Sequence, residues 1–159
     1  MIQKILNIEE VSYSSNLNSE KLKKKIEDLF EQRTLRLAGK LTSKNEFTAY
    51  DKWIVIGWNM PYLKRKAAYL YGKITKGENG SLIKLKVKPN SILPGFAFIS
   101  TLIGVLFTLK ALLNTYDDKF FLIIGSTFFV LGIIGYPMST FLKNRLRNKV
   151  VKYLDLNKV

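Results

Sequence analysis

The side chains of this 159-residue chain that could do chemistry are carboxylates, hydroxyls and lysines, because the sequence contains no histidine and no cysteine. Zinc sites of the Cys/His type, Cys-ligated iron–sulfur clusters, thiol nucleophiles and Ser-His-Asp triads are therefore excluded. No disulfide can form, so cysteine usage says nothing about the redox compartment.

The remaining acid–base candidates lack a catalytic spacing. The carboxylates mostly stand beside lysines, and the sequence has no glycine-rich phosphate-binding motif. Ser139 and Lys143, four residues apart, would fit a Ser–Lys dyad, but they lie at the end of an apolar run. We therefore predict that the protein is not an enzyme and holds no metal and no cofactor.

One segment combines aromatic and cationic side chains around a proline. It contains Trp58, Tyr62, Lys64, Arg65 and Lys66. Trp and Tyr favour the headgroup zone of a bilayer, and a cation near anionic lipid gains roughly 1 kcal/mol. The same residue types could bind single-stranded nucleic acid or form an ordinary solvated connection. We interpret the segment as a contact for the membrane interface or an acidic partner, with nucleic acid as the less favoured ligand.

The distribution of charge along the chain indicates which elements would position this segment. Of the net charge of +14, residues 1–91 carry +9, residues 92–142 carry none and residues 143–159 carry +5. The neutral block contains uncharged runs at 92–109 and 120–142, and Lys110 can snorkel. Runs of 18 and 23 residues match the roughly 20 needed to cross a bilayer. We expect a transmembrane helical hairpin with spans at about 92–113 and 120–142 rather than two helices buried in a soluble core, which a domain this small cannot surround.

The cations on either side of the hairpin predict its orientation. They are Lys84, Lys86, Lys88, Lys143, Arg145, Arg147 and Lys149. By the positive-inside rule, both termini are expected in the cytoplasm and the turn between the spans outside. The first eleven residues lack the apolar stretch of a signal peptide. The predicted location is therefore the cytoplasmic (inner) membrane, with two passes.

Small residues recur within both spans at helical spacing. They are Ser100, Gly104, Gly132, Gly135 and Ser139. Such residues let helix backbones approach closely, either within one hairpin, the interpretation we favour, or between copies of the chain. Pro137 is expected to kink the second span. Neither span contains a charged residue deep in the membrane, which argues against a proton relay or an ion-coupled transporter.

The flanking segments read as a small α+β domain. Apolar periodicity predicts a helix at 19–33, with strands near 4–13, 35–41 (Gly39 as a bulge), 47–50, 53–58, 69–76 and 81–88. Asn79-Gly80 indicates a hairpin between the last two strands. A basic helix at 143–154 could continue the second span and dock on the sheet. The predicted fold is a small antiparallel sheet with one or two packed helices, interrupted by the transmembrane hairpin.

These features predict three units and a non-catalytic role. The units are a cytosolic α+β domain at 1–91, the hairpin at 92–142 and a cytosolic basic helix at 143–159. We expect an integral membrane protein whose cytosolic domain binds a partner or ligand, as an anchoring or accessory subunit of a membrane complex. The expected partners are the anionic inner leaflet and a protein or a second copy. The alternative is a membrane-perturbing effector that senses a signal and oligomerises through its hairpin.

Overall fold

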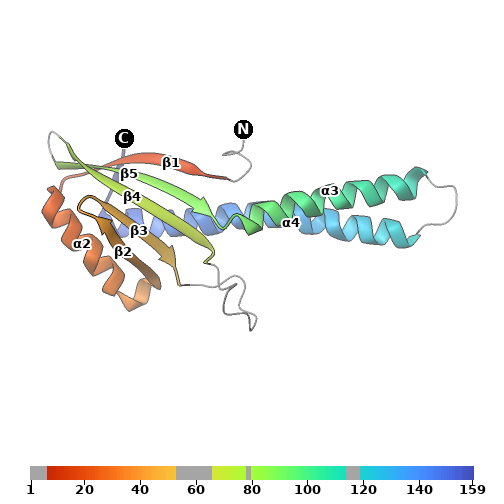
Figure 1. Ribbon diagram of the computed structural model, residues 1–159, viewed down its shortest axis with the longest axis horizontal. Coiled ribbons are helices and arrows are strands. Elements are labelled where there is room, and N and C mark those ends of the chain that lie inside the picture. Colours follow the sequence, from red (N-terminus) through yellow and green to blue (C-terminus); the bar gives the residue numbers. More distant parts are fainter. Residues whose placement is uncertain (1–6, 53–65, 78–79, 114–118) are drawn as a thin grey trace.

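The computed structural model describes residues 7–52, 66–77, 80–113 and 119–159. In chain order its elements are β1 (Glu9–Ser15), α2 (Ser19–Glu31), η1 (Arg33–Leu35), β2 (Leu37–Ser43), β3 (Glu46–Asp51), β4 (Ala68–Gly77), β5 (Gly80–Pro89), α3 (Ile92–Leu113), α4 (Lys119–Leu154) and β6 (Asn157–Lys158). The fold is α+β, as predicted. A sheet domain occupies one end of the molecule and a helical hairpin extends from it (Figure 1).

The strands form one antiparallel sheet in the order β2-β3-β4-β5-β1-β6. β4 and β5 pair over their whole length, from Ala68 with Pro89 to Gly77 with Gly80. In β5 the side chains of Ile83, Leu85 and Val87 are buried, while the lysines between them face away from the core. This alternation follows from the two-residue period of a strand and confirms the predicted hairpin and its in–out pattern.

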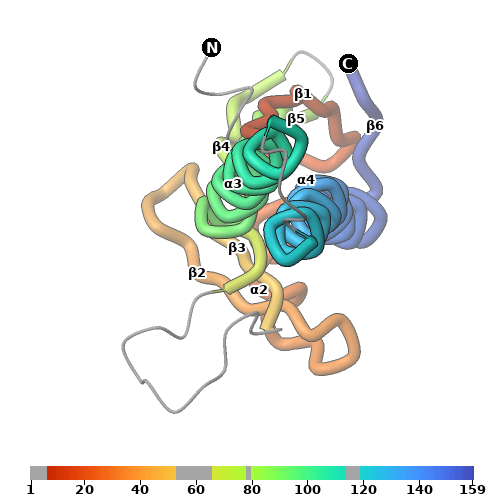
Figure 2. The backbone as a smooth tube through the Cα atoms, turned by 90° about the vertical axis from the view of Figure 1, so that its right-hand side faces the viewer, coloured from red at the N-terminus to blue at the C-terminus, as the bar shows by residue number. Residues whose placement is uncertain are grey.

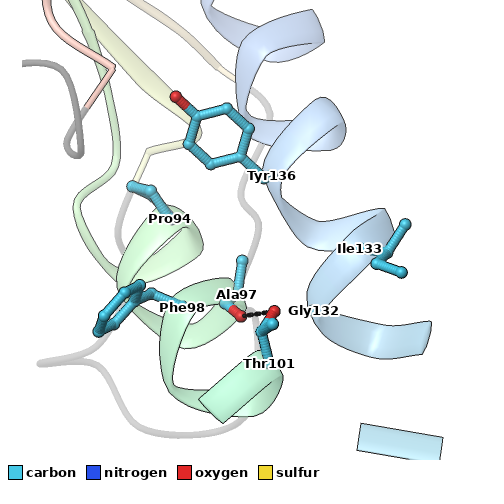
Figure 3. Close-up of a pocket in the computed structure, with 7 residues that line it drawn as sticks. All are labelled: Pro94, Ala97, Phe98, Thr101, Gly132, Ile133 and Tyr136. Atoms are coloured by element: carbon cyan, nitrogen blue, oxygen red, sulfur yellow. Dashed lines mark hydrogen bonds between the residues drawn. The ribbon is translucent and has the colours of Figure 1, made fainter. Parts of the chain in front are cut away.

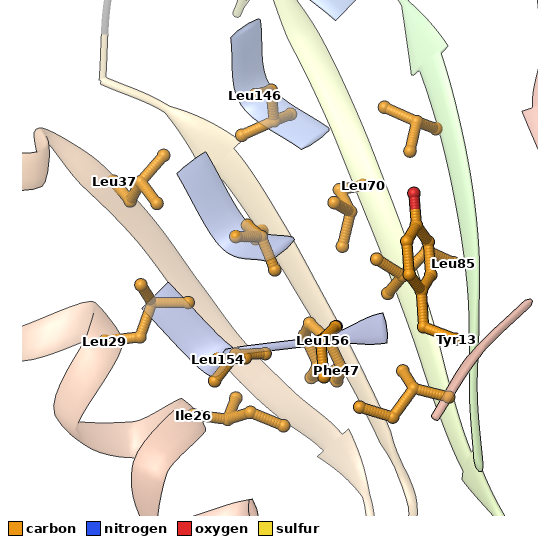
Figure 4. Close-up of a cluster of buried hydrophobic side chains, with 14 of the residues drawn as sticks. Tyr13, Ile26, Leu29, Leu37, Phe47, Leu70, Leu85, Leu146, Leu154 and Leu156 are labelled. Atoms are coloured by element: carbon orange, nitrogen blue, oxygen red, sulfur yellow. The ribbon is translucent and has the colours of Figure 1, made fainter. Parts of the chain in front are cut away.

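Helices α2 and α4 cover one face of the sheet and form the core with it (Figure 4). Asn18 caps α2 through its Oδ1, which accepts a hydrogen bond from the Lys21 amide at 2.9 Å. The helix then buries Leu22, Ile26 and Leu29. The C-terminal half of α4 contributes three further fully buried residues, at positions 146, 150 and 154. The other face of the sheet carries no helix in the described part of the chain and stays open.

Helix α4 is continuous from the tip of the hairpin to the core of the sheet domain. Its 36 residues pass through Pro137 without interruption and, at 1.5 Å per residue, extend over about 54 Å. The strands lie in an arc beside its C-terminal half (Figure 2). The predicted basic helix at 143–154 is therefore the docked end of α4, and Asp155, in the left-handed conformation with φ 55°, ends it.

Within the hairpin, large apolar side chains point outward. α3 and α4 are each long and apolar enough to cross a membrane. Most of their large residues are exposed, including Phe98 at 60%, Leu106 at 58% and Ile134 at 58%. α3 packs beside the N-terminal part of the longer α4 (Figure 1). The buried residues of these two helices are instead small, or they lie where the hairpin meets the sheet domain.

The small residues lie between α3 and α4 of the same hairpin. A Cβ on Gly104 would stand 2.6 Å from the Phe129 backbone nitrogen, and one on Gly132 would stand 2.8 Å from the Ala97 carbonyl oxygen. Ser100 and Ser139 are fully buried, and a Cβ on Gly135 would meet that of Ala97 at 3.0 Å. The close approach also depends on Gly125, whose added Cβ would meet the Thr108 amide nitrogen at 2.8 Å. Sequence analysis did not single out Gly125.

Several expected boundaries were wrong. The first strand begins at Glu9 and runs to Ser15, and α2 ends at Glu31 rather than at residue 33. The irregularity in β2 lies between Leu41 and Ser43 instead of at Gly39. Gly39 pairs regularly with Ala49, and the position requires glycine because an added Cβ would lie 2.4 Å from the ring of Phe30. The predicted strand at 53–58 lies outside the described residues.

Replacing Gly104 by alanine is expected to push the two helices apart. The atoms nearest the new methyl are all backbone, so no side chain can rotate away. We expect a loss of roughly 1–3 kcal/mol in unfolding free energy, the usual cost of overpacking, measured by thermal unfolding in a neutral detergent. Gly95→Ala is the matched control, because no atom lies within 4 Å of its added Cβ. Equal stabilities for the two variants would contradict the packing described here.

Candidate functional site

The open face of the sheet carries most of the exposed aromatic and cationic side chains of the sheet strands. Strand pairing sets Tyr50, Tyr69 and Lys88 in one row across β3, β4 and β5. The next row along the strands contains Lys40, Thr48, Tyr71, Lys86 and Glu10, and the row after it contains Glu46, Lys73, Lys84 and Ser12. We call these residues, together with Lys66, the Tyr–Lys face.

Lysines and tyrosines stack on each other within the Tyr–Lys face. The Lys88 Nζ lies 5.1 Å from the ring centroid of Tyr71 and 5.9 Å from that of Tyr69. The Lys66 Nζ lies 5.2 Å from the ring centroid of Tyr50. A cation above a tyrosine ring gains about 0.5–1 kcal/mol at an exposed site. The stacking restricts two flexible lysines and leaves donors on each ammonium group for an acceptor from outside.

At the far end of the same face, the lysines are paired with carboxylates. Lys84 contacts Glu10 at 2.9 Å, and Lys73 contacts Glu46 at 3.7 Å. The hydrogen bond from Lys84 lowers the pKa of the Glu10 carboxyl, although that group is exposed. A shallow groove of about 300 Å³ lies between these pairs, Thr48 and Tyr71. At the opposite end of the face, Lys66 and Lys88 have no carboxylate within ion-pair distance among the described residues.

Asn90 holds the end of the sheet at the start of the hairpin. Its Oδ1 accepts a hydrogen bond from the Ile92 amide at 3.1 Å and so caps α3. Its Nδ2 donates to the carbonyl oxygen of Lys66 at 3.0 Å, and its amide donates to that of Ala67 at 2.9 Å. Asn90 is only 4% exposed. One buried side chain thus ties β4, β5 and α3 together beside the Tyr–Lys face.

On the other side of the sheet, a buried ionic cluster joins α4 to β1. Lys143 is 5% exposed, and its Nζ contacts Glu9 Oε2 at 2.9 Å and Asn7 Oδ1 at 2.7 Å. Arg147 also pairs with Glu9. Burial raises the pKa of Glu9, but the hydrogen bond from Lys143 and the charges of Lys143 and Arg147 outweigh burial, so the net pKa lies below its ordinary value.

A second ionic contact fixes α4 at the other edge of the sheet. The Lys149 Nζ lies 2.9 Å from Asp51 Oδ2 and donates to the Leu35 carbonyl oxygen at 3.0 Å. Arg145 approaches the same carboxylate at 3.9 Å. Asp51 is 6% exposed, so its charge is compensated by these cations rather than by water. The two clusters hold α4 from both sides.

The structure distributes the predicted site residues over different roles. Trp58, Tyr62, Lys64 and Arg65 lie outside the described residues, whereas Lys66 belongs to the Tyr–Lys face. Lys84, Lys86 and Lys88 lie on that face too. Lys143, Arg147 and Lys149 pair with buried or half-buried carboxylates, while Arg145 lies at the rim. The stacking tyrosines were missed, although Tyr69 and Tyr71 alternate with the apolar positions of β4 and so share a face with Lys73, which was a visible signal.

Ser139 and Lys143 do not form a catalytic dyad. The Ser139 hydroxyl donates to the Tyr136 carbonyl oxygen at 2.7 Å, within the helix, and Lys143 is engaged by Glu9 and Asn7. Among the described residues, no cluster of three or more carboxylates could hold a metal ion.

An apolar groove of about 490 Å³ lies between α3 and α4. Figure 3 shows its wall, in which the Thr101 hydroxyl donates to the Ala97 carbonyl oxygen at 2.9 Å. The other polar group in this wall is the hydroxyl of Tyr136. Since acid, base and nucleophile do not converge here, the groove is suited to an apolar chain rather than to a reaction.

Comparison with known proteins gives no relative from which a role could be transferred. No protein family, no curated protein and no solved structure matches the chain. The functional conclusion therefore rests on the geometry above.

Glu9→Gln is expected to destabilise the joint between α4 and β1 in a pH-dependent way. The variant leaves the buried Lys143 ammonium without its carboxylate, at a cost of roughly 1–3 kcal/mol at neutral pH. Because the folded-state pKa of Glu9 lies below 4.5, its contribution is present above pH 4.5 and is lost as the pH falls through the folded pKa. Thermal unfolding in detergent between pH 7 and 3 measures the effect.

The difference between wild type and Glu9→Gln should therefore shrink on acidification. Glu10→Gln is the control, because it removes the neighbouring carboxylate from an exposed ion pair and should change stability little. A Glu9→Gln effect that is absent at neutral pH, or that grows below pH 4.5, would show that the cluster does not stabilise the joint.

Proposed function

We propose that the chain is an integral membrane protein that uses its sheet domain, on the cytoplasmic side, to bind an acidic partner. It would serve as an anchoring or accessory subunit of a membrane complex. The observation that carries the proposal is the combination of an apolar hairpin with a sheet whose outward face presents stacked lysines and tyrosines.

The exposure of the hairpin supports insertion into a bilayer. A soluble monomer rarely exposes an apolar patch larger than a few hundred Å². Here, outward-facing Phe, Leu, Ile and Val side chains extend along both helices, far from the N-terminus and away from the core of the sheet domain. A helix from a soluble core would bury these side chains. Lipid tails are a favourable solvent for them.

The distribution of cations supports a cytoplasmic sheet domain. The positive-inside rule counts Lys and Arg near the ends of the spans and is not a rule of net charge. The ion pairs of Lys143, Arg147 and Lys149 therefore do not weaken the signal. Lys88 comes four residues before α3, on the same side, while Lys110 and Lys119 at the other end stand beside two aspartates.

The Tyr–Lys face supports binding rather than catalysis. It combines exposed cations with aromatic rings, and a surface of this kind recognises acidic groups by charge and by stacking. The described residues around it provide neither a metal site nor a nucleophile with an adjacent base. The membrane-perturbing alternative has no specific observation in its favour, because its small residues face each other within one hairpin.

The absence of cysteine allows a direct test of orientation. Single cysteines at Lys44 and Lys158, in the sheet domain, and at Lys119, at the tip of the hairpin, can be labelled with a membrane-impermeant maleimide in intact spheroplasts. We expect Lys119→Cys to react at once, and the other two to react after permeabilisation. Immediate labelling at all three positions, or recovery of the protein in the soluble fraction, would contradict the proposal.

Binding through the Tyr–Lys face can be tested with a fluorescent oligo-glutamate peptide and the full chain in neutral detergent. Lys84→Gln, Lys86→Gln and Lys88→Gln together should weaken binding about tenfold, because three charge contacts at roughly 0.5 kcal/mol each sum to about 1.5 kcal/mol, and a tenfold change in affinity corresponds to about 1.4 kcal/mol. Fluorescence anisotropy at low and at moderate salt measures the affinity.

The matched control changes the same number of charges on helix α2, through Lys21→Gln, Lys23→Gln and Lys24→Gln. An equal loss of affinity in both triple variants would show that the peptide senses net charge only. The Tyr–Lys face would then not be the binding surface.

A further inference from the structure

We propose that Lys66, Lys88, Tyr50 and Tyr69 form a site for the anionic headgroup of a phospholipid in the cytoplasmic leaflet. We call these four residues the basic corner. This inference rests on the proposed membrane insertion and adds a ligand class and a location to it. The corner is the end of the Tyr–Lys face nearest the hairpin, where β4 begins and β5 ends.

The position of Lys88 places the corner at the membrane surface. Lys88 is separated from Ile92, where α3 begins, by three residues. Even a fully extended link of this length spans at most about 14 Å, and the headgroup zone occupies roughly 5–8 Å of that distance. The remainder, about 6–9 Å, is comparable to the Debye length of about 8–10 Å. Lys88 therefore senses the charge of the leaflet.

Lys66 is held at least as close to the membrane. Its carbonyl oxygen accepts the hydrogen bond from Asn90, which in turn caps α3 through the Ile92 amide. The link from Lys66 to the first residue of the span is thus a single buried side chain.

The two tyrosines of the basic corner favour the headgroup zone of a membrane. Tyr50 and Tyr69 are directly paired across β3 and β4, and each has a lysine ammonium near its ring. Tyrosine is enriched at the headgroup level of membranes because the ring is apolar and the hydroxyl is polar. Among the described residues, neither Lys66 nor Lys88 has a carboxylate within ion-pair distance. Each ammonium group can therefore donate to an anionic oxygen from outside the protein.

A phospholipid fits the basic corner better than an acidic protein segment does. Strand β5 leads directly into α3, and the strands run toward the hairpin (Figure 1), so the basic corner is the part of the Tyr–Lys face closest to the headgroups. A protein bound to the Tyr–Lys face would instead reach the rows farther from the membrane. Lys84 and Lys73 are located there, each with its own carboxylate partner.

In the test, the full chain is extracted from liposomes that contain phosphatidylcholine and phosphatidylglycerol in equal amounts. Native mass spectrometry then measures which lipid the chain retains. We expect the wild type to retain phosphatidylglycerol in several-fold excess over phosphatidylcholine. Lys66→Gln combined with Lys88→Gln should reduce this preference to near parity. Lys66→Arg combined with Lys88→Arg should keep it, because the charge and the stacking remain.

The matched control is Lys73→Gln combined with Lys84→Gln, which removes the same charge from the same face of the sheet, farther from the membrane. It should leave the preference intact. The inference is overturned if the wild type shows no preference, if the Lys66/Lys88 variant keeps it, or if both double variants lose it equally. It is also overturned if the Lys66/Lys88 variant loses the acidic peptide while retaining phosphatidylglycerol, since the corner would then serve a protein partner.

Failure of the proposed function gives a different result. If carbonate extraction releases the chain from native membranes, insertion itself is wrong and the lipid measurement loses its premise. If the chain resists carbonate extraction but retains both lipids equally, insertion stands and the basic corner is not a headgroup site.

Discussion

The architecture depends on one helix whose two halves have different surroundings. The first part of α4 presents large apolar side chains outward, while its last part buries Leu146, Val150 and Leu154 against the sheet. The change takes place around Lys143, where an ammonium group is 5% exposed and is compensated by Glu9 and Asn7. A buried charge without those partners would cost several kcal/mol. The ion pair between Glu9 of β1 and Lys143 of α4 therefore marks the boundary between the apolar hairpin and the sheet domain.

The sheet domain and the hairpin are joined by several packed and hydrogen-bonded contacts rather than by one flexible tether. Asn90 holds β4 and β5 at the start of α3, and the ionic clusters around Glu9 and Asp51 hold both sides of α4. The close backbone approach at Gly104 and Gly132 joins α3 to α4 in turn. A force on the sheet domain would thus reach the hairpin through packed and hydrogen-bonded groups, without a flexible linker.

Much of the fold could be predicted from periodicity and charge. The lysines of β5 alternate with its buried residues, and the uncharged runs have the length of the two helices. Strand pairing is a property of residues far apart in sequence, so the position of β1 between β5 and β6 could not be derived from local patterns. The partners of Lys143 were equally hidden, because Glu9 and Asn7 precede it by more than 130 residues. The bulge was misplaced at Gly39 because a glycine signals close packing as well as irregular backbone.

The same reasoning explains why the cations divide into two groups. Those on α4 that face the sheet are taken up by carboxylates and contribute to the structure, so they cannot also provide a binding surface. Those on the open face stack on tyrosines near the hairpin and pair with glutamates farther from it. The charge available to an external ligand is therefore smaller than the +14 of the chain suggests. On the open face, Lys66 and Lys88 have no carboxylate within ion-pair distance among the described residues, and both lie where β4 and β5 meet the hairpin. A ligand that recognises this face by both charge and stacking therefore finds the two together at that end of the sheet.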